Sequence, residues 1–213
     1  MKHILISAAL CIISPIISAA TPINGWYSGV FGGYTYLPSN INKTKQSISY
    51  TDLNYQSGYD AGGNLGFKSN PMRYEGEVTY LNANVKSFKE NGLTQTNVGS
   101  YQNAILGLAN IYYDIPGLIT CLEPFLGVGL GYGWMNLKLN NFAPASTTDF
   151  RITNSAFAYQ GTAGLTYNFS ENYALNMGYR YIATSTISDY GHAFAAHIGN
   201  LGAVYRFDEA RYK

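Results

Sequence analysis

Apolar and aromatic residues alternate with small or polar residues in eight short stretches between residues 26 and 207. A period of two is typical of β-strands whose two faces meet different environments. The stretches lie near residues 26–36, 55–68, 72–85, 101–113, 125–137, 156–169, 173–182 and 194–207. The pattern predicts an all-β fold, an eight-stranded antiparallel up-and-down β-barrel.

The stretches differ in how clearly they assign their faces. In residues 72–85, Tyr74 and Tyr80 alternate with charged side chains, so the aromatic face is expected to point outward and the charged face inward. Glycines at every second position from Gly127 to Gly133 are expected to face a crowded lumen. Residues 101–113 mix apolar and polar side chains on both faces. The facing of that strand therefore stays open.

The connections between the stretches alternate in length. Four are long and polar, near 38–54, 86–100, 138–155 and 183–193, and the three between them are shorter, near 69–71, 115–123 and 170–172. Long extracellular loops at one end and short periplasmic turns at the other are typical of barrels that span the bacterial outer membrane.

Aromatic residues gather toward both ends of the stretches, as in the girdles at membrane interfaces. The girdle expected at the short turns contains Trp26, Phe67, Tyr74, Phe125 and Tyr167, and the one expected at the long loops contains Tyr36, Tyr80, Trp134 and Tyr181. A soluble barrel of the lipocalin kind is the alternative. It would turn its apolar face inward and expose charge, whereas the charged face here is the narrow, glycine-rich one.

Composition agrees with a membrane location. Only 12% of the residues are charged, against about 25% in an average soluble domain, and the chain contains 20 Tyr and 10 Phe. Residues 1–20 combine Lys2, an apolar run and a small-residue end, which predicts a signal peptide removed before Thr21. Residues 21–213 then form a single barrel domain with equal numbers of basic and acidic residues, and a nucleic-acid partner is not expected. Cys121 becomes the only thiol, which excludes an intramolecular disulfide.

Several segments together resemble the small eight-stranded outer-membrane proteins, covering the Opa-like and outer-membrane-protein-A-like barrels. The segments are Gly25-Trp26-Tyr27-Ser28-Gly29, Asn110-Ile111-Tyr112-Tyr113-Asp114, Pro124–Tyr132 and Gly178-Tyr179-Arg180-Tyr181. The resemblance covers essentially all of the predicted mature chain. It implies a monomer in the cell outer membrane, in contact with outer-membrane lipids and lipopolysaccharide, with no cofactor.

The resemblance also implies recognition by the barrel-assembly machinery through the last strand, at Tyr205 and Phe207. The chain departs from the family pattern here, because the family usually ends on Phe, whereas Asp208–Lys213 follow Phe207. The role of this tail stays open. The peptidoglycan-binding domain of the longer A-type proteins is not found in the sequence, so a wall-anchoring role is not carried over.

Charged residues on the inward phase predict an ion-pair network inside the barrel. The expected members are Asp60, Arg73, Glu75, Glu77 and Arg180, with Arg180 paired to Glu75 or Glu77. The same residues would also suit a polar conduction path. Since eight strands leave room for little more than side chains, we favour a filled lumen.

No spacing in the sequence predicts a catalytic or metal site. His192, His197 and Cys121 are dispersed, and neither a nucleophile–base pair nor a metal-ligand spacing is recognisable. Exposed residues of the long loops are the remaining candidates for contacts with a host or envelope ligand, namely Lys43, Lys45, Lys86, Lys89, Phe142 and Arg151. The sequence therefore favours a surface-exposed, adhesin-like structural or interaction protein over a small porin and, third, a lipid-modifying enzyme.

Overall fold

The computed structural model describes residues 23–38, 42–45, 48–90, 92–95, 99–116, 121–143, 146–186 and 193–207. Every regular element within these residues is a β-strand. Among them there is no helix with the length and apolar character needed to cross a membrane. The predicted signal peptide, His192 and the Asp208–Lys213 tail lie outside the described residues.

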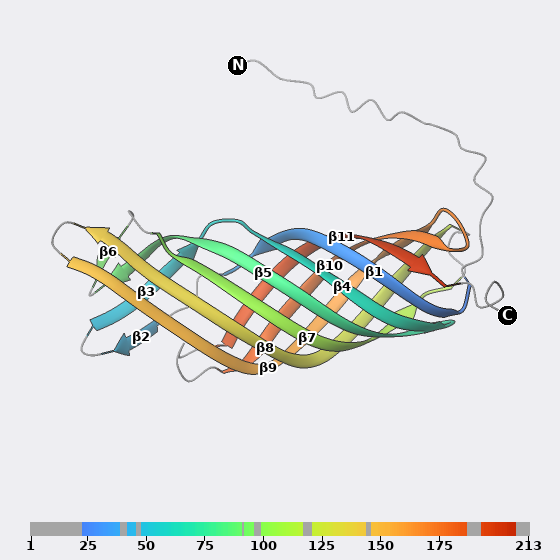
Figure 1. Cartoon of the computed structure of the whole chain (residues 1–213), viewed down its shortest axis with the longest axis horizontal. Coiled ribbons are helices and arrows are strands. Elements are labelled where there is room, and N and C mark those ends of the chain that lie inside the picture. The colour runs from blue at the N-terminus through green and yellow to red at the C-terminus, as the bar shows by residue number, and fades with distance from the viewer. Residues whose placement is uncertain are drawn as a thin grey trace, which may run out of the picture.

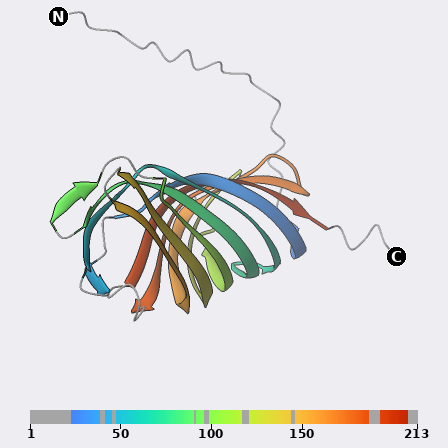
Figure 2. The ribbon, with the colours of Figure 1, turned by 60° about the vertical axis from the view of Figure 1, so that its left-hand side comes forward.

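Eight long strands form a closed antiparallel barrel (Figures 1 and 2). They are β1 (Gly25–Tyr36), β4 (Gly58–Ser69), β5 (Met72–Glu90), β7 (Tyr101–Asp114), β8 (Leu122–Ala143), β9 (Ser146–Asn168), β10 (Tyr173–Thr186) and β11 (Ala193–Arg206). The pairing of β1 with β11, from Tyr27↔Arg206 to Tyr36↔His197, closes the ring. The predicted eight-stranded antiparallel barrel is confirmed.

The two ends of the barrel differ. At the short-turn end, on the right in Figure 1, β1 begins and β11 finishes. At the opposite end, which we call the hairpin end, three short strands extend the sheet: β2 (Asn42–Lys45), β3 (Ile48–Tyr55) and β6 (Leu93–Gln95). β2 pairs with β3, and both β3 and β6 pair with β5.

Much of the sequence expected to form long loops is strand. β5 continues to Glu90, and β8 and β9 remain paired as far as Ala143↔Ser146, so the expected loops at 86–100 and 138–155 are largely hairpin. These extensions are mostly polar, with apolar residues such as Phe88 and Leu139 at isolated positions, so alternation was too weak to indicate them. Tyr55 belongs to the hairpin strand β3 rather than to the barrel wall.

The structure also assigns the faces of β7. Leu106 and Leu108 are buried inside the barrel together with Asn110, whereas Ile105 and Ile111 are about half exposed on the outside. Sequence alternation was unclear here because the inward face changes from apolar to polar along the strand. The lumen likewise changes from mainly apolar near the hairpin end to polar near the short-turn end.

Candidate functional site

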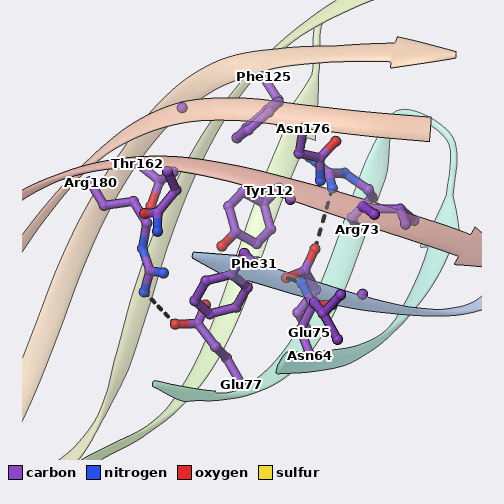
Figure 3. Close-up of a pocket in the computed structure, with 17 residues that line it drawn as sticks. Phe31, Asn64, Arg73, Glu75, Glu77, Tyr112, Phe125, Thr162, Asn176 and Arg180 are labelled. Atoms are coloured by element: carbon purple, nitrogen blue, oxygen red, sulfur yellow. Dashed lines mark hydrogen bonds and ion pairs between the residues drawn. The ribbon is translucent and has the colours of Figure 1, made fainter. Parts of the chain in front are cut away.

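The half of the lumen nearer the short-turn end contains two clusters of charged side chains. In the first, the Arg180 guanidinium of β10 pairs with the Glu77 carboxylate of β5 (Figure 3). Arg180 Nη2 also donates to Gln160 Oε1 at 2.8 Å. Asn110 Nδ2 donates to the other Glu77 oxygen at 2.9 Å and itself accepts from Gln160 Nε2 at 2.6 Å. Thus residues of four strands are joined around one ion pair.

The second cluster lies closer to the short turns. Arg73 Nε donates to Asp114 Oδ1 at 2.8 Å, and Arg73 Nη1 lies 3.3 Å from Glu75 Oε1. Lys68 Nζ lies 2.9 Å from Asp114 Oδ2 and 2.8 Å from Glu123 Oε2. Of the two carboxylates expected for Arg180, the structure therefore places Glu77 against it and Glu75 against Arg73.

Aromatic and amide side chains complete this second cluster. Tyr27 donates its hydroxyl to Glu75 Oε1 at 2.5 Å, and Asn64 Nδ2 donates to Glu75 Oε2 at 2.8 Å. The Arg73 guanidinium lies 4.8 Å from the ring centres of Tyr112 and Phe125. The expectation that Phe125 belongs to the girdle is wrong, because Phe125 has the phase of the lumen glycines and is only 5% exposed.

Asp60 lies inside the lumen as expected, but its partners differ from the expectation. Its carboxylate accepts hydrogen bonds from Asn200 and from Thr35 Oγ1. It forms no ion pair with any charged side chain in the described part of the chain. The expectation that Asp60 belongs to the ion-pair network is therefore wrong.

Sequence reasoning missed three members of the network, Lys68, Asp114 and Glu123. Asp114 continues the inward phase of β7, whose facing could not be read from the sequence. Lys68 and Glu123 lie at strand ends, where a polar residue is as easily read as part of a turn. The available signals were the inward phase of Lys68, opposite to that of Phe67, and the phase of the β8 glycines, which Glu123 shares.

A cavity of ≈ 60 Å³ separates the two clusters (Figure 3). Arg73, Glu75, Glu77 and Arg180 all line it. Since one water needs about 10–15 Å³ of such volume, the cavity has room for about four waters. Several buried atoms around it have no hydrogen-bond partner among the described protein groups: Asn64 Oδ1, Arg73 Nη2, Thr162 Oγ1, Asn176 Oδ1 and Asn200 Oδ1. The cavity is thus polar and suited to water.

The half of the lumen nearer the hairpin end is mainly apolar, although it also buries Gln102 and Thr184, and this change of character was not predicted from the sequence. Its side chains form one buried core that we call the apolar plug. Members with at most 3% exposure include Leu81, Leu106, Met135, Leu137, Ile182 and Ile198. Leu139 and Phe88 continue the plug toward the hairpins. A hydrophobic constriction of this kind opposes the passage of water and ions.

Glycines of β8 allow side chains to pack closely in the half of the lumen nearer the short-turn end. A Cβ atom at Gly127 would overlap the Tyr112 ring, and one at Gly129 would overlap the Asn110 amide. Both glycines face the lumen as predicted. β8 therefore has no side chain at the two positions where Tyr112 and Asn110 lie against it.

The outer wall of the barrel is apolar and aromatic. Val30, Val78, Val128, Leu130 and Met177 are each at least 58% exposed near its middle. The eight other expected girdle residues all point outward: Trp26, Phe67, Tyr74 and Tyr167 toward the short-turn end, and Tyr36, Tyr80, Trp134 and Tyr181 toward the hairpin end. An apolar band between two aromatic belts matches the profile of a bilayer.

The candidate ligand contacts lie on strands rather than loops. Lys86 is exposed on β5, Arg151 is exposed on β9, and Lys89 forms an ion pair with Asp52 at 2.8 Å. Lys43 and Lys45 are on β2 and Phe142 is on β8, but their side chains lie outside the described set. Their expected role in ligand contact remains a prediction.

His197 is on the outer wall, where its Nδ1 lies 2.6 Å from the Tyr179 hydroxyl and its ring contacts Tyr36 and Tyr181. Cys121 is a free, half-buried thiol beside a short turn. No group of three or more His, Cys, Asp or Glu residues with the arrangement of a metal site occurs in the parts of the chain that the structure covers.

The end of β11 carries the expected assembly residues. The rings of Tyr205 and Phe207 are 5.3 Å apart, edge to face, and the Phe207 amide donates to the Trp26 carbonyl at 2.9 Å. The last strand is thereby closed against the first. Recognition of Tyr205 and Phe207 by the assembly machinery remains a prediction.

Comparison with known proteins agrees with this geometry. The family described as outer membrane protein beta-barrel domain matches residues 5–207. An outer membrane protein of Gluconacetobacter diazotrophicus is 27% identical over 199 residues, which cover 85% of this chain and 52% of that protein. An uncharacterized protein of Brucella abortus is 25% identical over 174 residues, covering 68% of this chain and 58% of the relative. The chain thus spans about half the length of the curated relatives that it matches.

Solved structures share the fold at lower identity. OprG of Pseudomonas aeruginosa aligns with a TM-score of 0.56 and 14% identity, covering 89% of this chain and 98% of that one. Neisserial surface protein A aligns with a TM-score of 0.54 and 16% identity, covering 86% and 97%. Ail, the attachment invasion locus protein of Yersinia pestis, aligns with a TM-score of 0.50 and 18% identity, covering 87% and 100%.

Proposed function

The chain belongs to the outer-membrane β-barrel family and is located in the cell outer membrane, and from this premise we propose that it is a surface-exposed interaction protein that binds its partner through the hairpins. The length of the strands carries this proposal. β8 has 22 residues and β9 has 23. A tilted strand needs only about 9–11 residues to cross the hydrocarbon core. Roughly half of each strand is therefore available outside the bilayer.

The strand length beyond what crosses the bilayer lies at the hairpin end. At the short-turn end, β4 and β5 are joined through Asn70 and Pro71, and β9 and β10 through residues 169–172. At the hairpin end, β2, β3 and β6 add further strands, and the β8–β9 hairpin extends past Trp134 by nine more residues of β8. Rigid strands hold such a surface in place more firmly than loops, which supports a role in binding.

The filled lumen supports the same proposal against a small porin. The ion-pair clusters occupy one half of the interior and the apolar plug occupies the other. Catalytic chemistry is not part of the proposed function, since His197 faces the membrane side and bonds to Tyr179. The Yersinia protein bears a name that describes attachment and invasion, but its likeness to this chain shows the fold alone. The hairpins, not that likeness, therefore carry the proposal.

Trimming the hairpins tests it. In β8–β9, an Asn-Gly turn would replace residues 140–149, because Leu139 and Phe150 are opposite each other and a two-residue turn can join them. The β2–β3 hairpin and β6 would be shortened in the same way. Cells that display the trimmed barrel should lose adhesion to epithelial monolayers and to immobilised matrix protein. Equal surface display, measured by labelling and by heat-modifiable gel mobility, is the control. Undiminished adhesion after all three changes would contradict the proposal.

A further inference from the structure

Near the hairpin end, the outer wall carries three successive rows of side chains across β5, β7, β8 and β9. We call them the girdle row, the amide row and the cationic row. Backbone register places Tyr80, Ile105, Trp134 and Ser155 in the girdle row, then Asn82, Asn103, Asn136 and Thr153 in the amide row, then Asn84, Tyr101, Lys138 and Arg151 in the cationic row. Alternation along each strand turns all three rows away from the lumen.

Two positive charges meet in the cationic row. Lys138 and Arg151 are directly opposite each other on β8 and β9. Lys86 lies two residues beyond Asn84 on β5, with the same outward phase, and is exposed. None of the three forms an ion pair with another side chain that the structure describes. Like charges directly opposite each other destabilise a sheet, so an anion bound between them would relieve a real cost.

Lys89 differs from these three residues, because it has an ion-pair partner. It lies three residues beyond Lys86 on β5, next to the buried Phe88, and pairs with Asp52 at 2.8 Å. The acidic positions Glu90 and Asp149 are farther along β5 and β9 from the girdle row than Lys86 and Arg151 are. The level nearest the membrane is therefore the cationic one.

The heights of the rows match the profile of a lipid. Successive rows are two residues apart, which is about 6.7 Å along a strand. With a strand tilt of about 35–45°, two steps raise the cationic row by roughly 10 Å above the girdle row. Acyl chains would end at the aromatic girdle row, sugar hydroxyls would meet the amide row, and phosphates would reach the cations.

We propose that Lys138 and Arg151, with Lys86 beside them, form a binding site for the phosphate groups of lipopolysaccharide in the outer leaflet. An arginine offers a planar, bidentate donor to phosphate and a lysine a compact charge. The amide row and the girdle row below select an amphiphile over a soluble phosphate, because only an amphiphile occupies all three levels. This lipid site is independent of the proposed hairpin function, and it fixes the depth and rotation of the barrel in the membrane.

The test compares wild type with Lys138→Gln/Arg151→Gln, refolded into phosphatidylcholine nanodiscs. Diphosphoryl lipid A and fully dephosphorylated lipid A are added at equal mole fractions, and retained lipid is measured by native mass spectrometry. Wild type should retain the diphosphoryl form about tenfold better or more, because each cation near a lipid surface contributes about a factor of five. The double variant should lose this preference. Lys89→Gln removes the same charge from a side chain that is already paired with Asp52, and this variant should keep the preference.

Heat-modifiable mobility verifies that each variant is folded, and Lys86→Gln/Arg151→Gln replaces the double variant if it is not. Equal retention of the two lipid A forms by wild type would overturn the site, as would full preference in the folded double variant. A third arm adds inorganic pyrophosphate. If pyrophosphate displaces diphosphoryl lipid A at equimolar concentration, the cations bind soluble anions and the lipid site is wrong.

Discussion

Arg180 and Glu77 form an ion pair inside the barrel although 103 positions separate them in the sequence. Each is at most 5% exposed, so neither charge has access to bulk water. Gln160, Asn110 and Thr79 supply further hydrogen bonds to the pair. Because β5 and β10 lie on different parts of the ring, the pair ties opposite walls together across the lumen.

Removing the cation of this pair should destabilise the barrel strongly. In Arg180→Ala, the Glu77 carboxylate stays buried without a counter-charge, at a cost of about 3–5 kcal/mol. We expect a lower urea midpoint in lipid vesicles and easier loss of heat-modifiable mobility. Lys89→Ala is the control, since its pair with Asp52 is exposed and exposed pairs contribute about 0–1 kcal/mol. An unchanged midpoint for Arg180→Ala would show that the pair does not hold the lumen together.

Replacing both charges should cost less than replacing one. Arg180→Met/Glu77→Leu leaves apolar side chains of similar size and no buried charge, and such exchanges are often neutral or stabilising. The double variant should therefore have a urea midpoint closer to wild type than Arg180→Ala. If the double variant is as unstable as the single one, the loss arises from packing rather than from an unpaired charge.

Adding one methyl group on the inner face of β8 should be harmful, and adding it on an outer face should not. Gly127→Ala would place its Cβ in the Tyr112 ring, and overpacking of this kind costs about 1–3 kcal/mol. Gly161→Ala is the matched control, because a Cβ there meets nothing within 4 Å. Refolding yield and the urea midpoint measure the difference. Equal effects at the two sites would mean that the lumen has spare room.

A charged residue placed on the apolar outer wall should destabilise the barrel more the deeper it lies in the membrane. Val128 is 66% exposed midway along the outward face of β8, so Val128→Arg should cost about 2–4 kcal/mol in a bilayer. Ser155 lies in register with Trp134 at the girdle, and Ser155→Arg should cost about 0–1 kcal/mol. Urea titrations of folding in lipid vesicles measure the loss of unfolding free energy for each variant. A similar cost at both positions would contradict the assigned membrane depth.

The barrel itself could be predicted from the sequence because a membrane forces a strict alternation on every strand that crosses it. Glu75 and Glu77 alternate with Tyr74 and Val78, and this pattern settled both the strand and its facing. The alternation weakens where the membrane ends. The extensions of β5, β8 and β9 are mostly polar, with isolated apolar residues such as Phe88 and Leu139, so they were read as loops although they are paired strands.

The interior could be predicted only in part, because the phase of a residue says which side it faces but not which partner it meets. Asp60 has the inward phase of Arg180 and yet bonds to Asn200. Lys68 and Asp114 meet only because β4, β5 and β7 are neighbours in the closed ring, with β5 lying between β4 and β7. The apolar plug was missed because the inward residues Leu106 and Leu108 look the same as lipid-facing ones.

Single-channel recording in planar bilayers tests the closed lumen most directly. With the polar clusters around Arg180 in one half and the apolar plug around Leu106 and Leu137 in the other, purified wild-type protein should give no stepwise current above the bare bilayer in 1 M KCl. Insertion would be verified in parallel by protease protection. Stable, ohmic unit steps that appear with inserted protein would contradict the filled lumen and favour a small porin.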